Sequence, residues 1–307
     1  MTDASPRAAA LLDLLRRLRE ADYAFVTPTP DTHARNLARR KGECARDLRD
    51  VFGWNLPFGD DAPGAEILGL LRGAGAVEQT PEGERSAVRV ARLGSDLFLH
   101  SSYPTEDEDS VFFGPDSWRF ARFLERELAG SCPRRIVDVG TGSGVGAIAA
   151  ARLCPDARVT MTDVNARALD LARVNAAAAG VEADFVCGNG VEPVEGGFDL
   201  ALLNPPYIAD DGGRAYRDGG DLHGARLAID LSRAILERLD SGGRLLLYTG
   251  APIVNGRDRL REELGRLDAE LSYREMDPDV FGEELDKPAY RDVERIAVVN
   301  AVLTKPG

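Results

Sequence analysis

The sequence contains little that would indicate a membrane or secreted protein. No apolar run of about 18 residues, the length that a transmembrane helix needs, occurs anywhere along the chain. The N-terminus, Met1 to Pro6, is polar and is not followed by the apolar core of a signal peptide. We therefore expect a cytoplasmic protein with no membrane partner.

Cysteine and histidine are also scarce. The four cysteines show no C-x-x-C pairing, and the three histidines are scattered along the chain. Structural zinc sites need such residues in closely spaced pairs. No metal site is therefore expected, and the cysteines are interpreted as the reduced thiols of a cytoplasmic protein.

Basic residues are outnumbered by acidic ones. The 38 lysines and arginines stand against 51 aspartates and glutamates, which gives a formal net charge of −13 at pH 7. Attraction to polyphosphate depends on lysine and arginine, so this balance disfavours a nucleic-acid substrate without excluding one, because local patches matter more than the total. The one basic segment, residues 33–49, is interpreted as a solvated helical face, with partner docking as the alternative.

The first 110 residues are predicted to form a smaller domain that begins with helices. Leucines recur at helical spacing from Leu11 to Leu18, which indicates an amphipathic first helix. After the breaks at Pro28 and Pro30, we expect Asp31 or Thr32 to cap a second helix. Third and fourth helices are predicted at residues 44–51 and 65–72.

A predicted hairpin follows these helices. Ala76–Gln79 and Ala87–Arg92 alternate like paired strands around the turn Thr80–Gly83, and Leu97–His100 adds a third strand. Helices followed by a hairpin resemble a winged-helix unit. We interpret residues 1–110 as a substrate-recruiting or dimerising domain, with the acidic segment 101–110 as an exposed linker to the rest of the chain.

Strands and helices alternate over residues 111–307. Such alternation is typical of a parallel sheet with helices on both faces. The predicted strands are Ile136–Val139, Val159–Thr162, Ala183–Cys187, Leu200–Leu203, Arg244–Tyr248, Leu271–Met276 and Ile296–Leu303. A loop rather than a full helix separates the last two, so one of them is expected to be antiparallel.

A glycine-rich turn follows the first of these strands. The sequence Asp138-Val139-Gly140-Thr141-Gly142-Ser143-Gly144 leads into a predicted helix. Glycines let the backbone pass close to a ligand, and a helix N-terminus points free N–H groups into the same space. About 20 residues further on, the next strand ends in Asp163, whose carboxylate can accept hydrogen bonds from two ribose hydroxyls. Dinucleotide and S-adenosylmethionine (SAM) sites both fit this pattern.

The tetrapeptide Asn204-Pro205-Pro206-Tyr207 follows the fourth predicted strand. An amide or aromatic amine is a poor nucleophile because its lone pair is delocalised. Two acceptors aimed at its N–H groups, the side-chain oxygen of Asn204 and the carbonyl of Pro205, would favour charge development on that nitrogen. The prolines stiffen the loop, and Tyr207 is expected to stack on the planar group or to wall the site. These four residues are the predicted catalytic residues.

In this order, the motifs resemble the Rossmann-like, class I SAM-dependent methyltransferases. The resemblance implies an α/β fold with a seven-stranded domain over residues 111–307 and SAM as the cofactor. It implies that the glycine turn meets the amino-acid half of SAM, that Asp163 holds the ribose, and that Asn189, where the family often has Asp, contacts the adenine amine. The implied cofactor-binding residues are Asp138, Gly140, Thr141, Gly142, Gly144, Asp163, Val164, Asn189 and Asn204.

Within that class, the N-P-P-Y sequence resembles enzymes that methylate adenine N6, cytosine N4 or glutamine N5. Ile208 and the later glycine loop Gly219–Gly224 are similar to the HemK-type release-factor glutamine methyltransferases, whose N-terminal domain grips a protein substrate. The P-R-P-x-T-E stretch of that family corresponds here to Val111–Arg119, which lacks the arginine and the glutamate. Phe113, Pro115 and Asp116 in this stretch either line the site entrance or serve core packing and helix capping.

The resemblance favours an enzyme that methylates a protein glutamine, with a protein partner such as a translation factor. One alternative is a base methyltransferase acting on ribosomal RNA, transfer RNA or DNA, so a nucleic-acid partner stays open. Another is a small-molecule N-methyltransferase whose N-terminal domain is a lid or dimer arm. An inactive SAM-binding regulator and a nucleotide-dependent oxidoreductase are the least favoured, because neither accounts for an intact N-P-P-Y loop. The oligomeric state is left open.

Overall fold

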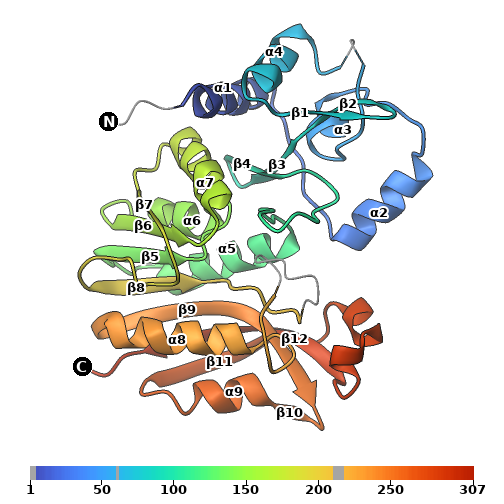
Figure 1. Ribbon diagram of the computed structural model, residues 1–307. Coiled ribbons are helices and arrows are strands. Elements are labelled where there is room, and N and C mark those ends of the chain that lie inside the picture. Colours follow the sequence, from blue (N-terminus) through green and yellow to red (C-terminus); the bar gives the residue numbers. More distant parts are fainter. Residues whose placement is uncertain (1–4, 60–61, 210–217) are drawn as a thin grey trace.

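A computed structural model describes residues 5–59, 62–209 and 218–307 of the chain. The N-terminal elements lie at the top of Figure 1, and a large sheet flanked by helices lies below them. The helices are α1 (Pro6–Glu20), α2 (Pro30–Arg39), α3 (Leu48–Phe52), α4 (Ala65–Gly73), α5 (Pro115–Leu128), α6 (Val145–Leu153), α7 (Ala166–Ala179), α8 (Arg226–Arg238), α9 (Arg259–Leu264), and the 3-10 turns η1 (Gly282–Asp286) and η2 (Pro288–Tyr290). The strands are β1 (Val77–Thr80), β2 (Gly83–Ser86), β3 (Val88–Leu93), β4 (Asp96–Ser101), β5 (Arg135–Val139), β6 (Arg158–Asp163), β7 (Asp184–Cys187), β8 (Phe198–Leu203), β9 (Leu239–Val254), β10 (Arg257–Asp258), β11 (Glu270–Asp277) and β12 (Arg295–Thr304).

The large sheet has the strand order β11-β12-β9-β8-β5-β6-β7, and the short β10 pairs with β9. Strands β5 to β9 pair in parallel, whereas β12 runs antiparallel to both β9 and β11. The prediction that one of the last two strands is antiparallel is therefore confirmed, as is the Rossmann-like α/β class. The strand order reverses between β5 and β8, and in open α/β sheets ligands bind beside the carboxyl ends of the strands at such a point.

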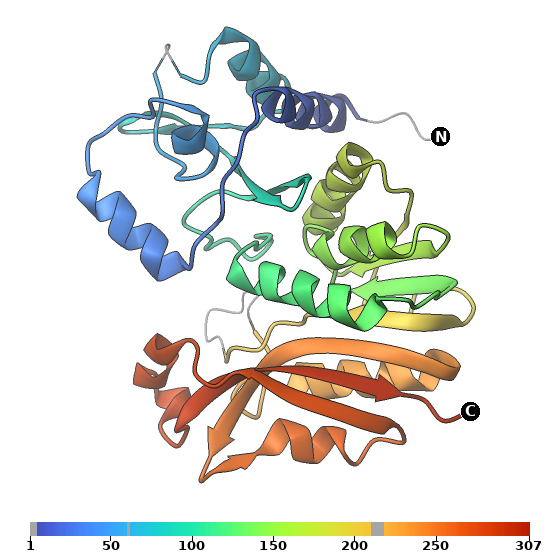
Figure 2. The same ribbon diagram turned by 180° about the vertical axis from the view of Figure 1, so that it is seen from behind.

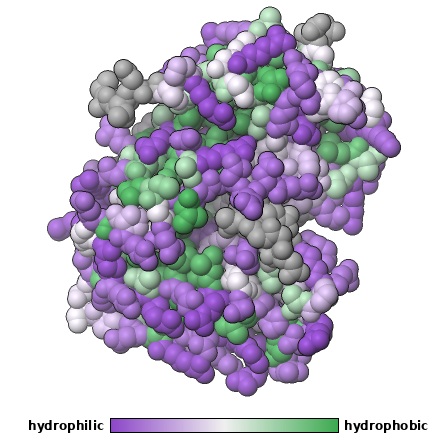
Figure 3. Space-filling view, in the orientation of Figure 1, coloured by the Kyte–Doolittle hydropathy of each residue, from purple (hydrophilic) through white to green (hydrophobic). Residues whose placement is uncertain are grey.

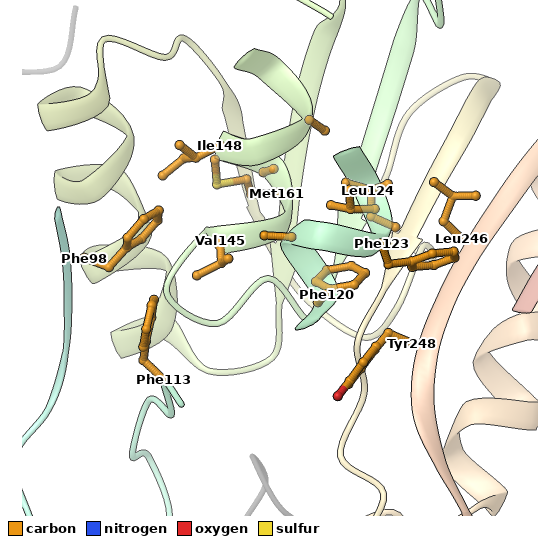
Figure 4. Packing of buried hydrophobic residues seen from close by; sticks show 14 of the residues in the cluster. Phe98, Phe113, Phe120, Phe123, Leu124, Val145, Ile148, Met161, Leu246 and Tyr248 are labelled. Carbon is orange, nitrogen blue, oxygen red and sulfur yellow. The ribbon is translucent and has the colours of Figure 1, made fainter. Parts of the chain in front are cut away.

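Helices cover both faces of this sheet because successive strand residues point to opposite sides. Ile136 and Leu202 join the cluster that includes residues of α5 and α6, whereas their neighbours Val137 and Leu203 join the cluster with α8 and α9. Figure 4 shows part of the first cluster, in which aromatic residues of α5 pack beside Tyr248 of β9. Within the described residues, no helix combines the length and the hydropathy needed to cross a membrane.

The hairpins of the N-terminal unit, which we define as α1 to β4, differ from the prediction. Val77–Thr80 pairs with Gly83–Ser86 across the predicted turn, and β3 pairs with β4 instead. The predicted partner, Ala87–Arg92, therefore belongs to a second hairpin, because the tight turn at residues 81–82 brings Gly83 directly opposite Thr80. The second helix also begins earlier than expected, since Thr29 caps it and Pro30 occupies its first turn, where proline is tolerated.

The acidic residues 106–109 of the predicted linker are exposed as expected, but the segment 101–110 is held at both ends. Ser101 and Ser110 are buried, and the backbone N–H of Ser101 donates to the carbonyl of Val111 at 3.0 Å. The N–H of Val111 donates in turn to Oγ of Ser101 at 2.8 Å. Buried polar groups need hydrogen-bond partners, and these two bonds supply them. The segment is therefore a loop with its two ends held together, and not a flexible linker.

The N-terminal unit packs against α7 of the sheet region. Asn175, fully buried on α7, accepts a hydrogen bond from the N–H of Leu99 at 2.8 Å and donates to the carbonyls of Leu99 and Ser143 at 3.0 and 2.9 Å. Since Leu99 lies on β4 and Ser143 in the glycine turn, one amide joins the two parts of the chain directly beside the predicted cofactor turn. Figure 2 shows the N-terminal unit and the sheet region from behind, with α2 lying below the rest of the N-terminal unit.

Candidate active site

A cavity of about 280 Å³ opens at the carboxyl ends of β5, β6 and β8. It lies at the point where the strand order reverses, and its volume is close to the lower end of small-molecule sites, about 300 Å³. With one exception, every predicted site residue lines it. Those residues are Asp138, Gly140, Thr141, Gly142, Asp163, Val164, Asn189, Asn204, Pro205, Pro206 and Tyr207.

The exception is Gly144, which does not line the cavity. It caps the N-terminus of α6 with a φ of 84°, and a Cβ built on it would lie 3.4 Å from the Cβ of Ala172. The structure therefore places Gly144 in the packing of α6 against α7. Gly140 and Gly142 differ, because both have positive φ (64° and 55°) and their Cβ positions are open space. The turn can thus present bare backbone to a ligand.

Asp138 is a buried carboxylate at the floor of the cavity. Its Oδ2 accepts hydrogen bonds from Oγ1 of Thr141 at 2.6 Å and from the N–H of Ala147 at 2.9 Å. Burial raises the pKa of Asp138 from 3.8 to about 6, against the effect of these two bonds. A cation placed in the cavity would stabilise the ionised form of this carboxylate.

Asp163 ends β6, and its carboxylate links the end of this strand to the glycine turn. Oδ2 accepts from the N–H of Gly142 at 2.9 Å, and Oδ1 accepts from the N–H of Asn165 at 2.9 Å. Burial raises the pKa of this carboxyl, and the backbone N–H bonds oppose that effect. Beyond it, Val164 is 59% exposed, and Asn189 follows β7 at the cavity wall. An exposed valine next to a carboxylate suits the flat, apolar face of a nucleobase beside its ribose.

The N-P-P-Y loop leaves the end of β8 and forms the facing wall. Asn204 is partly exposed, whereas Pro205 and Tyr207 are buried. The ring of Tyr207 lies against β9, where a Cβ on Gly250 would come within 2.4 Å of Cδ2, and it meets the ring of Phe281 edge-on at 5.8 Å. Of the two expectations for Tyr207, the structure favours a wall of the site.

Two residues of the site were not assigned to it from the sequence. Asp116, left open between lining the site and capping a helix, does line the cavity, and it accepts a hydrogen bond from the hydroxyl of Tyr207. Phe281 also lines the cavity, with a left-handed φ of 56° that is uncommon for a bulky residue. Phe113, by contrast, is fully buried in the core, and Pro115 begins α5.

The loop after the tetrapeptide needs glycine because it packs closely against the tetrapeptide, which the sequence did not reveal. A Cβ on Gly224 would lie 2.4 Å from the carbonyl oxygen of Tyr207, and one on Gly219 would lie 2.8 Å from its Cα. These glycines let residues 218–224 lie directly against the N-P-P-Y backbone. The preceding Tyr216 and Arg217 lie outside the described residues.

Apolar side chains from several elements line part of the cavity. Pro30 of α2, Phe112 and Leu231 of α8 line it together with Phe281. Figure 3 shows a mostly hydrophilic face with hydrophobic surface at mid-height, below the N-terminal elements. Because Pro30 belongs to the N-terminal unit, that unit contributes to the same cavity as the N-P-P-Y loop.

Comparison with known proteins agrees with this geometry. The family model of the methyltransferase small domain matches residues 119–267. Among solved structures, Trm5b from Pyrococcus abyssi superposes with a TM-score of 0.50 at 13% sequence identity, covering 75% of this chain and 62% of that one, which shows the fold alone. The protein is a class I methyltransferase. Enzymes of this class take the methyl group from SAM, so the predicted cofactor is confirmed.

Relatives of known function identify the family. A release factor glutamine methyltransferase from Deinococcus radiodurans is 36% identical over 292 residues, covering 89% of this chain and 96% of that protein. One from Bordetella pertussis is 39% identical over 140 residues, covering 43% of this chain and 51% of that protein. A ribosomal RNA small subunit methyltransferase C from Escherichia coli is 36% identical over 117 residues, covering 38% of this chain and 31% of that protein. The chain belongs to the release factor glutamine methyltransferase family.

Proposed function

We propose that the enzyme methylates the side-chain amide nitrogen of a glutamine in a protein, and that a release factor is its substrate. The observation that carries this proposal is the N-P-P-Y loop, which shares one cavity with the glycine turn and Asp163. An acceptor nitrogen held at this loop would lie beside the methyl donor, and holding two reactants together is the larger part of such catalysis.

The residues around the turn fit SAM. Gly140 and Gly142 leave backbone open to the amino-acid half, and Asp138 offers a buried carboxylate that suits its ammonium group. Asp163 would accept hydrogen bonds from the ribose hydroxyls, while Val164 and Asn189 would contact the adenine. When bound, SAM supplies a methyl group activated by its sulfonium.

Asn204 and Pro205 would hold the acceptor amide. The side-chain oxygen of Asn204 and the carbonyl of Pro205 each accept one N–H of a primary amide, which draws its lone pair out of conjugation as the new bond forms. The amide nitrogen then loses one proton to water, so no general base is required. Phe112 and Phe281, which line the cavity, suit the aliphatic stem of a glutamine side chain.

We propose that residues 1–110 recruit the protein substrate. Pro30, at the start of α2, lines the cavity, and the unit is joined to α7 through Asn175. A protein bound to this unit would therefore present a side chain directly to the N-P-P-Y loop. Residues 111–307 would carry the chemistry.

A second candidate acceptor is the exocyclic nitrogen of an RNA base. The match to the ribosomal RNA methyltransferase of Escherichia coli favours it, although that match covers only 38% of this chain. The same two acceptors would serve a base amine, because both groups are planar and both carry two N–H donors.

The test uses the chemistry of the product. Purified protein is incubated with methyl-labelled SAM and the release factors of the same cell, and the labelled product is hydrolysed in strong acid. A methylated glutamine amide must release its label as volatile methylamine, because amide hydrolysis frees the nitrogen together with its methyl group. Label that stays on a nucleobase, or no label in a release factor, would contradict the proposal.

A further inference from the structure

A single buried carboxylate in the cavity lining, that of Asp116, holds the N-P-P-Y loop. The hydroxyl of Tyr207 donates to Oδ2 of Asp116 at 2.8 Å, across 91 residues of sequence. The hydroxyl of Tyr248 donates to Oδ1 at 2.7 Å, and Nη1 of Arg119 donates to the same oxygen at 3.1 Å. Three donors from three places in the chain therefore converge on Asp116.

Asp116 and its two tyrosine partners are buried, so the loss of one of the hydrogen bonds between them would destabilise the protein. Asp116 is 6% exposed, Tyr207 8% and Tyr248 1%. A buried carboxylate is stable only with such partners, and removing one leaves a polar group unpaired away from water. Arg119 is itself held by Asp277 of β11 at 3.2 Å, so the carboxylate is linked to α5, β9, β11 and the N-P-P-Y loop at once.

The position of Tyr207 bears directly on Asn204. Only Pro205 and Pro206 separate the two residues, and proline rings fix the backbone torsion φ at both positions. A change in the direction of the Tyr207 side chain would therefore turn the carbonyl of Pro205 and the side chain of Asn204. The ring has little room to adapt, because a Cβ on Gly250 would come within 2.4 Å of its Cδ2 and the ring of Phe281 packs against it in a T-shaped arrangement.

We propose that Asp116 is a positioning residue for methyl transfer. Its carboxylate fixes the hydroxyl of Tyr207, and thereby sets the two acceptors that hold the acceptor nitrogen. The role rests on the proposed function of Asn204 and Pro205, but it does not depend on whether the acceptor is an amide or a base.

Two substitutions test it. Tyr207→Phe removes the donor of this bond, and Asp116→Leu removes its acceptor with a side chain of similar shape. We expect kcat to fall about tenfold or more for each, with the Kd for SAM changed less than about twofold, since misplacement of reacting groups acts on turnover. The double variant should be no more than about twofold slower than the slower single variant, because both changes break the same bond.

The matched control is Tyr273→Phe. Tyr273 of β11 donates to Oδ2 of Asp258 at 2.6 Å, which is a bond of the same kind, and neither residue lines the cavity. This variant should lose stability but keep kcat. If Tyr207→Phe lowers thermal stability as Tyr273→Phe does and leaves kcat equally unchanged, the positioning role is wrong and the bond serves only folding.

The assay uses whichever acceptor the wild-type enzyme labels. Label found only in nucleic acid would overturn the glutamine proposal and leave the comparison of variants valid. Wild-type activity on a protein glutamine together with unaffected variants would overturn only the role of Asp116. Multiplicative losses in the double variant would also overturn it, because they would show that the two side chains act separately.

Discussion

The carboxylate of Asp163 and the backbone N–H of Gly142 are joined by a hydrogen bond of 2.9 Å. This bond connects the end of β6 to the glycine turn that follows β5, so the two parts of the predicted cofactor site are set relative to each other before any ligand binds. Pre-organisation of this kind lowers the cost of ordering a site on binding.

Asp163→Ala should weaken SAM binding about tenfold or more, because two ribose hydroxyls would lose their acceptor and Gly142 would lose its restraint. Calorimetry on the variant measures this directly. Asp184→Ala is a suitable control, since that carboxylate pairs with Arg158 at the exposed edge of the sheet. Equal affinities in the two variants would remove Asp163 from the cofactor site.

Asn204→Ala should lower turnover and leave SAM affinity unchanged, whereas Asp163→Ala lowers SAM affinity. We expect turnover to fall about 100-fold, because an acceptor that acts on the developing charge is lost, while SAM affinity stays unchanged. Asn189→Ala should instead weaken SAM binding and leave turnover at saturating SAM close to that of the wild type. The paired measurements are single-turnover rates and calorimetry, and an unchanged rate in Asn204→Ala would exclude that residue from the mechanism.

The pH dependence of SAM binding should follow Asp138. Burial raises the pKa of this carboxyl to about 6, so without ligand the folded protein holds the proton more tightly than the unfolded chain does. Its contribution to stability is therefore full at acid pH and is lost as the pH rises through about 6. An ammonium group bound beside it favours the ionised form, so SAM affinity should be about tenfold weaker at pH 5 than at pH 7.5.

Asp138→Asn supplies the control for that titration. It keeps an acceptor for Thr141 and Ala147 but cannot ionise, so its SAM affinity should be lower at pH 7.5 and nearly flat down to pH 5. The same slope in both proteins would show that another group, such as Asp163, controls the titration.

Gly250→Ala tests the packing of the catalytic loop. Its Cβ would come within 2.4 Å of Cδ2 of Tyr207, so the ring must move or the strand must shift. We expect the free energy of unfolding to fall by about 1–3 kcal/mol, together with a loss of turnover. Gly69→Ala, at an exposed helical position with nothing within 4 Å of the new atom, should stabilise by about 0.5–1 kcal/mol and leave turnover unchanged. Denaturant unfolding and label transfer measure both effects, and an unaffected Gly250→Ala would contradict the packing argument.

The strands of the sheet could be predicted because each is a short apolar run ended by a turn. The main error of length was in β9, predicted as Arg244–Tyr248 but running from Leu239 to Val254, because glycines such as Gly250 interrupt its apolar pattern. In the structure Gly250 is needed for the ring of Tyr207, so the residue that weakened the strand signal is one that the site requires.

The residues of the site could be predicted where they follow strand ends in local motifs, as Asp163 and Asn204 do. The partners that hold them could not, because they come from distant parts of the chain. Asp116 is separated from Tyr207 by 91 residues, and Phe281 reaches the cavity from the segment between β11 and β12. No local pattern in the sequence marks such contacts.

The most direct test of the account is the transfer of labelled methyl groups from SAM into a lysate of cells that lack the enzyme, followed by separation of protein, nucleic acid and small molecules. The account predicts label in a protein of release-factor size, released by acid hydrolysis as methylamine and absent with the Asn204→Ala enzyme. Label confined to nucleic acid or to small molecules would contradict it.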